Sequence, residues 1–155
     1  MKKLLKATIL LTSLVAVLAW SDKSRYDITI SELFEKSIAS DDSTYMAIAI
    51  YRCSALLALV NGIKERDAGI VDDKDVSGEL LKTGYYLSVA KQRERGVKVD
   101  LEKSMERAKQ EYDRHYMKYK SWMTDNYDAS GDYWGSHKDL QSEILDCTSI
   151  AQEIL

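Results

Sequence analysis

The chain has 155 residues with 22 Lys or Arg and 25 Asp or Glu, so its formal net charge at pH 7 is −3. This acidic balance argues against nucleic acid as a partner, since phosphate binding requires a basic face. The chain contains no proline and only seven glycines, so long stretches have nothing to interrupt a helix. The composition therefore predicts an all-α protein.

The first 19 residues have the pattern of a secretory leader. Three lysines precede an uncharged run over residues 7–20, and Ala19 provides a small residue for cleavage. This run is shorter than the roughly 18 to 20 residues that a membrane-spanning helix needs. We therefore expect a signal peptide at 1–19, a periplasmic or secreted location, and a single helical domain at 20–155. The alternative is an uncleaved leader that anchors the protein in a membrane. Without the leader the chain has 19 basic and 25 acidic residues, a net charge of −6.

Two helices are predicted in the first half of the mature chain. Ser31 and Glu32 begin a short helix that ends near the polar cluster at 40–43, and this cluster also caps the next helix. The second helix is expected from Thr44 to about Arg66. Its apolar positions recur at spacings of four and three residues, which is the seam of a packed helix. These positions are Met46, Ile50, Cys53, Leu57 and Val60.

Three further helices are predicted after a polar loop at 72–75. The first begins at Asp75 or Ser77 and stops at Gly96, and Asp100 opens the longest helix. The apolar and aromatic stripe of that helix comprises Leu101, Met105, Ala108, Tyr112, His115, Tyr119 and Trp122.

The last helix follows a predicted loop from Asp125 to Ser136, a segment rich in Asp, Gly and aromatic residues. Ser136 and Asp139 resemble a capping box for this helix. Together the elements predict a small antiparallel bundle of four main helices plus a short N-terminal helix.

The two cysteines predict one disulfide between helices. Cys53 and Cys147 both lie beyond the leader, and an oxidising compartment favours their pairing. Cys147 follows Leu140 and Ile144 by seven and three residues, the same intervals that separate Cys53 from the apolar residues before it. Both thiols therefore point inward, and we expect the bond to fasten the helix of Thr44 to Arg66 against the last helix.

Two segments resemble, in part, the calcium loop of EF-hand proteins, with alternate oxygen side chains followed by glycine. The candidate ligands are Asp73, Asp75 and Ser77 in the first segment, and Asn126, Asp128 and Ser130 in the second. The twelfth position, which is a bidentate Glu in that family, is Gly84 in one segment and His137 in the other. The resemblance implies at most a weak calcium site, because the ligand that completes coordination is missing. No other cofactor is expected.

Enzyme activity has no positive support in the sequence, and we nominate no catalytic residue. The only histidines are His115 and His137, and no zinc or di-iron motif accompanies them. The chain also lacks a nucleophile elbow, a P-loop and a dinucleotide fingerprint. An enzyme is therefore the third hypothesis, after a protein-interaction module and a weak calcium-binding protein.

The aromatic residues favour the interaction hypothesis. Ten Tyr and three Trp accompany a single Phe, and Tyr and Trp suit half-exposed surfaces because each joins an apolar body to a polar group. The predicted patch near the 125–136 loop comprises Tyr116, Tyr127, Tyr133 and Trp134. The leading hypothesis is an exported helical protein that binds an unknown protein partner through this patch, as an inhibitor or accessory subunit.

Overall fold

The computed structural model describes residues 26–70 and 74–155, and this part of the chain contains five α-helices and no β-strand. The helices are α2 (Ile30–Ser40), α3 (Ser43–Ala68), α4 (Val76–Glu94), α5 (Leu101–Ser130) and α6 (Lys138–Ile154). The prediction of an all-α helical bundle is confirmed. The predicted leader and the candidate ligand Asp73 lie outside the described residues.

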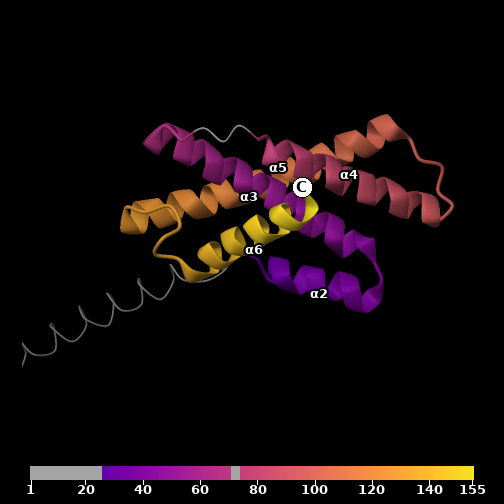
Figure 1. The fold of residues 1–155 in the computed structure, drawn as a ribbon, viewed down its shortest axis with the longest axis horizontal. Helices are drawn as coiled ribbons and strands as arrows, with labels where there is room; N and C mark the ends of the chain where they lie inside the picture. The colour runs from indigo at the N-terminus through magenta and orange to yellow at the C-terminus, as the bar shows by residue number, and fades with distance from the viewer. Residues whose placement is uncertain (1–25, 71–73) are drawn as a thin grey trace, which may run out of the picture.

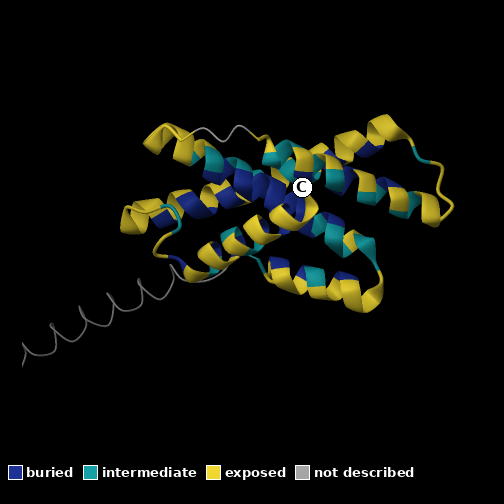
Figure 2. Cartoon of the chain, in the orientation of Figure 1, coloured by how far each residue is buried: buried dark blue, intermediate teal, exposed yellow. Residues whose placement is uncertain are grey.

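Helix α3 runs through the middle of the bundle and packs against all four other helices, while α2 also contacts α6 and α4 also contacts α5 (Figure 1). It is buried on nearly all sides from Ala47 to Val60 (Figure 2). The predicted seam is buried at four of its five positions and half-buried at Met46. The small residues Ala47, Ala49 and Ala55 are buried too, so α3 is a central helix rather than an amphipathic surface helix.

This central position explains an ambiguity in the sequence of α3. By length and apolar composition the helix could cross a membrane, but 67% of its most apolar window is buried inside the bundle. Arg52 interrupts the apolar run, and its side chain is buried among other helices. Burial in a protein core therefore accounts for the hydrophobicity of α3.

The helix starts confirm three predicted caps and correct two. Asp42, Asp75 and Asp100 accept backbone N–H bonds at the starts of α3, α4 and α5. Helix α2 begins one residue earlier than predicted, because Thr29 and Glu32 form the capping box.

The capping box predicted for α6 is wrong. His137 is the N-cap residue and makes no capping bond with its side chain. The Ser136 hydroxyl instead donates to Asn126 Oδ1 and to Ser130 Oγ, at 3.5 and 2.9 Å. These bonds use Ser136 to fasten the α5–α6 connection to the end of α5.

The predicted loop from Asp125 to Ser136 is helical in its first half. Helix α5 continues to Ser130 and ends where Gly131 adopts a φ of +76°, a left-handed conformation that suits glycine. Asn126 is buried, and its Nδ2 donates to the carbonyl of Asp132 at 2.7 Å. This contact turns the chain back along the end of α5, which no local composition signal could indicate.

The disulfide joins Cys53 in α3 to Cys147 in α6, as predicted, and their Cα atoms lie 4.9 Å apart. Both side chains are fully buried. A disulfide of this kind is typical of proteins that fold in an oxidising compartment.

Candidate functional site

Three of the four predicted patch residues come together at the end of the bundle where α5 turns into α6. The rings of Tyr127 and Tyr133 stack with their centres 4.4 Å apart, and Trp134 lies 6.2 Å from Tyr133. Tyr127 is 45% exposed, whereas Tyr133 and Trp134 are half-buried against the core. Asp132 stabilises the turn that carries Tyr133 and Trp134, because its Oδ1 accepts the backbone N–H groups of Trp134 and Gly135 at 3.0 and 2.9 Å.

Tyr116, the fourth predicted residue, shares a hollow of about 360 Å³ with Tyr133. We call this space the tyrosine hollow. It lies between the C-terminal half of α3 and the middle of α5, and glycine at position 62 leaves it open on the α3 side. Its lining comprises Ala58, Leu59, Gly62, Ile63, Arg66, Tyr116, Lys120, Met123, Thr124 and Tyr133.

The charges that line the tyrosine hollow are positive. Arg66 donates to the Tyr133 hydroxyl at 2.8 Å, and its guanidinium lies 5.4 Å from the centre of that ring. Asp67 forms an exposed ion pair with Arg66 at 2.6 Å but does not line the hollow. Lys120 contributes the second positive charge. The hollow therefore offers two aromatic rings, an apolar floor and two cations, without a carboxylate in its lining.

In the first candidate calcium segment, the described ligands Asp75 and Ser77 form hydrogen bonds within the bundle. Asp75 caps α4 by accepting the N–H of Gly78 at 2.9 Å. Ser77 lies within α4 and donates to the carbonyl of Ser54 at 2.9 Å, which ties α4 to α3.

In the second segment, Asn126, Asp128 and Ser130 all belong to α5. Asn126 donates to the α5–α6 connection, and the Ser130 hydroxyl donates to the carbonyl of Asn126 at 2.8 Å. Within residues 26–70 and 74–155, no three His, Cys, Asp or Glu side chains are grouped as a metal site would require. Asn126 and Ser130 of the second segment thus bond to the end of α5 and to the connection that follows it.

A buried ionic cluster, which the sequence analysis did not predict, connects three helices. Arg52 of α3 forms an ion pair with Glu143 of α6, and both side chains are at most 3% exposed. Tyr119 of α5 donates to the other Glu143 oxygen and accepts from Arg52 Nε at 3.2 Å. Arg52 also donates to the carbonyl of Ile28 at 2.7 Å. The partners satisfy one another, as buried charges require.

Burial controls the protonation of this cluster. It raises the pKa of Glu143, because the loss of water outweighs the attraction of Arg52 and the hydrogen bond from Tyr119. Burial also raises the pKa of Tyr119 well above its usual value, so its phenol remains a proton donor. One sequence signal could have revealed the cluster: Arg52 is the only charged residue between Thr44 and Ile63. A lone charge in an apolar central helix needs a buried partner.

His115 extends the cluster through Tyr26. The Tyr26 hydroxyl and His115 Nδ1 form a hydrogen bond of 3.0 Å, and the Arg52 guanidinium lies 3.6 Å from the centre of the Tyr26 ring. Burial, with help from nearby cations, lowers the pKa of His115 to about 4. His115 is therefore neutral at pH 7, and its contact of 4.0 Å with Glu111 is not an ion pair there.

His137 is buried beneath the α5–α6 connection. Trp122 Nε1 donates to His137 Nε2 at 3.2 Å, whereas His137 Nδ1 has no hydrogen-bond partner. The imidazole also meets the Trp122 ring edge-on, with the two ring centres 5.0 Å apart. This histidine thus fixes the orientation of Trp122 close to the tyrosine-rich end of the bundle.

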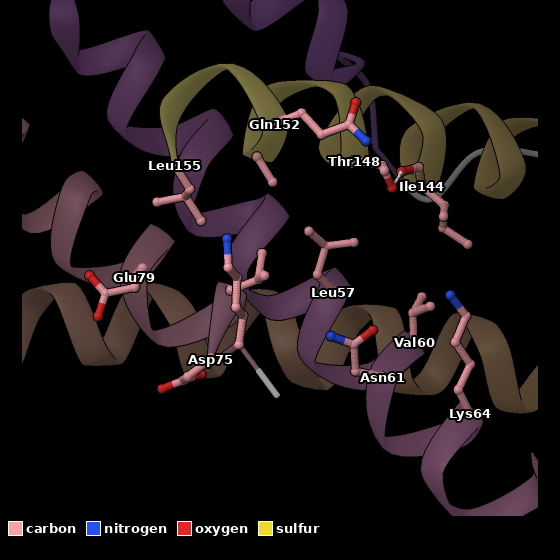
Figure 3. Close-up of a pocket in the computed structure, with 13 residues that line it drawn as sticks. Leu57, Val60, Asn61, Lys64, Asp75, Glu79, Ile144, Thr148, Gln152 and Leu155 are labelled. Atoms are coloured by element: carbon pink, nitrogen blue, oxygen red, sulfur yellow. Dashed lines mark hydrogen bonds between the residues drawn. The ribbon is translucent and has the colours of Figure 1, made fainter. Parts of the chain in front are cut away.

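A groove of about 790 Å³ lies between α3, the start of α4 and α6 (Figure 3). We call it the α3–α6 groove. Helices α4 and α6 both pack on α3 but make at most a marginal contact with each other, so a strip of α3 lies uncovered between them. Apolar side chains dominate its walls, namely Leu57, Val60, Val76, Ile144, Ala151 and Leu155.

These features define a small disulfide-linked helical bundle with open hollows on its surface and a buried ionic cluster. Comparison of the chain with protein-family models, with curated proteins and with solved structures finds no match.

Proposed function

We propose that this protein is an exported interaction module that binds an acidic segment of a partner protein in the tyrosine hollow. The single observation that carries the proposal is the combination of Tyr116, Tyr133, Arg66 and Lys120 around one open space. Tyrosine and arginine are the residue types most enriched at binding hot spots, because they give large contact areas and directional polar groups. The absence of a carboxylate from this lining favours a negatively charged partner.

The structure of the patch supports binding rather than simple packing. The Tyr127 and Tyr133 rings stack on one another, and Asp132 holds the connection that carries Tyr133, so little ordering is needed when a partner docks. Prearranged side chains lower the entropy cost of association. The predicted leader and the disulfide favour a periplasmic or secreted location for the complex.

The experiment uses peptide display on the disulfide-bonded mature protein. A random library of 12-residue peptides is selected against the wild type, and enriched peptides are then measured individually by fluorescence anisotropy. We expect acidic peptides to be enriched and to lose at least about tenfold in affinity with Lys120→Glu or Tyr116→Ala, both at residues that line the hollow, which is the cost of one hot-spot contact.

Matched controls separate the patch from the rest of the surface. Tyr86 of α4 is 65% exposed and Lys109 of α5 is exposed, and both lie outside the tyrosine hollow. Tyr86→Ala and Lys109→Glu should leave affinity unchanged. Enriched peptides without acidic character, or equal losses in the patch and control variants, would reject the proposal.

A second experiment tests the natural partner. A photo-crosslinking amino acid at position 127 should capture one discrete protein from the exported fraction of the source cells, and the same group at position 86 should not. The captured protein should bind the purified wild type and lose affinity with Lys120→Glu. Failure of that second step would show that the capture did not depend on the tyrosine hollow.

A further inference from the structure

The α3–α6 groove is separate from the tyrosine hollow and has a different chemistry. Leu57, Val60, Asn61 and Lys64 line it from α3, at the spacing of one helix face. Ile144, Thr148, Ala151 and Leu155 line it from α6, at the same kind of spacing. The two rows face each other across the opening in Figure 3. The result is a long apolar channel with polar groups at its edges.

The charged side chains along the groove differ in whether they already have an interaction partner. Asp75 caps α4, and Glu79 forms an ion pair with Lys82 at 2.6 Å, so both carboxylates already have partners. Lys64 is exposed and forms no ion pair among the described residues. In Figure 3 its ammonium group extends from α3 toward Val60 and Ile144, at the opposite end of the groove from Leu155. Lys74, the other lysine of the lining, has an interaction partner, so Lys64 is the lysine of the groove that has no ion-pair partner among the described residues.

We propose that the α3–α6 groove binds a single-chain amphiphile with a carboxylate head, of the long-chain fatty acid class. The carboxylate pairs with Lys64, and the aliphatic chain lies between Leu57 and the α6 row toward Leu155. The volume of about 790 Å³ is within the range of small-molecule sites.

The proposed site predicts how the affinity should change with the chain length and the head group of the ligand. Burial of each CH₂ group contributes to binding, so palmitate should bind in a one-to-one complex whereas butyrate should not bind. Hexadecanol has the same chain without the charge and should bind more weakly than palmitate. A charged head group paired with Lys64 supplies this difference.

The test measures binding to delipidated, disulfide-bonded mature protein by native mass spectrometry and by displacement of a fluorescent fatty acid. Lys64→Gln should weaken palmitate binding about tenfold while leaving hexadecanol binding unchanged. Thr148 is exposed at the groove, so Thr148→Trp should fill the space and weaken both ligands at least about tenfold.

Two controls have matched chemistry. Ser149→Trp places the same ring on the neighbouring exposed residue of α6, which does not line the groove, and Lys109→Gln removes a lysine elsewhere. Both should retain wild-type binding. Far-UV circular dichroism and thermal unfolding show that each variant is folded before its binding is compared.

Several results would overturn the proposal. One is the absence of a one-to-one palmitate complex below the concentration at which palmitate aggregates. Another is an equal effect of Thr148→Trp and Ser149→Trp on palmitate binding. A third is palmitate binding that does not change with Lys64→Gln. Binding of an amphipathic peptide but not palmitate would also overturn it. Tyr127→Ala should leave palmitate binding unchanged, so the result is independent of the proposed partner site.

Discussion

Arg52 and Glu143 form a fully buried ion pair that connects the same two helices as the Cys53–Cys147 disulfide. Arg52 precedes Cys53 in α3, and Glu143 lies one helical turn before Cys147 in α6. A polar and a covalent connection therefore stabilise one crossing of α3 and α6. They differ in energetics, because the ion pair carries a desolvation cost that the disulfide does not.

Removal of Glu143 should be strongly destabilising. Glu143→Ala leaves the Arg52 charge buried without its partner, and we expect a loss of about 3 to 5 kcal/mol in the free energy of unfolding. Urea denaturation measures the loss. As a control, Lys82→Ala removes an exposed ion pair with Glu79 and should cost less than about 1 kcal/mol. The double variant Arg52→Met with Glu143→Leu should lose less than Glu143→Ala. Equal losses for Glu143→Ala and Lys82→Ala would contradict the importance of burial.

Stability should depend on pH through His115. The pKa of His115 is about 4 in the folded protein, whereas an unfolded histidine titrates near 6.5. The neutral imidazole therefore stabilises the fold above pH 6.5, and this contribution is lost as the pH falls toward 4. The shift corresponds to about 3 kcal/mol.

Glu143 changes the stability with pH in the opposite direction, over a pH range that overlaps that of His115. Its folded pKa is raised, so its contribution is present below the unfolded pKa and declines as the pH rises. A comparison of the wild type with His115→Gln cancels the contribution of Glu143 to the pH dependence, because both proteins contain Glu143. Chemical denaturation from pH 7.5 to 4 should give a steeper fall for the wild type. Parallel curves would show that His115 does not titrate as proposed.

Reduction of the disulfide should lower the stability of the whole bundle. The bond closes a loop between residues 94 apart in sequence, and the chain-entropy model gives roughly 4 to 5 kcal/mol for such a loop. Thermal unfolding of the wild type should shift to a lower midpoint in the presence of a reductant. A Cys53→Ala, Cys147→Ala double variant should unfold at a lower temperature and should not respond to the reductant. A wild-type midpoint that does not change after verified reduction would contradict this prediction.

Two glycines should respond differently to the same substitution. A Cβ at Gly84 of α4 would lie 2.6 Å from the Tyr51 ring, which is buried and is hydrogen-bonded to Ser88 at 3.0 Å. Gly84→Ala should therefore cost about 1 to 3 kcal/mol by overpacking. At Gly62 of α3 nothing lies within 4 Å, so Gly62→Ala should stabilise the helix by up to about 1 kcal/mol. Urea denaturation of both variants tests the pair, and similar effects would show that Tyr51 can move aside.

The candidate sites were predictable to different degrees. Ten tyrosines pointed to a surface patch, and the structure brings Tyr127, Tyr133 and Trp134 together at one end of the bundle. Arg66 and Lys120 were not predicted there, because they come from different helices and no sequence spacing relates them to Tyr133. Of the two segments that resemble a calcium loop, the second is not a loop up to Ser130, because α5 continues to that residue.

The sequence by itself determined the helices, most of their caps and the pairing of its two cysteines. These features depend on local rules: the absence of proline, an aspartate before three of the helices at Asp42, Asp75 and Asp100, and a fixed spacing of apolar residues. The tertiary structure alone decided that Arg52 meets Glu143 and that α4 and α6 leave a groove over α3. Both depend on how helices distant in sequence cross, and crossing geometry is set by side-chain packing rather than by periodicity within one helix.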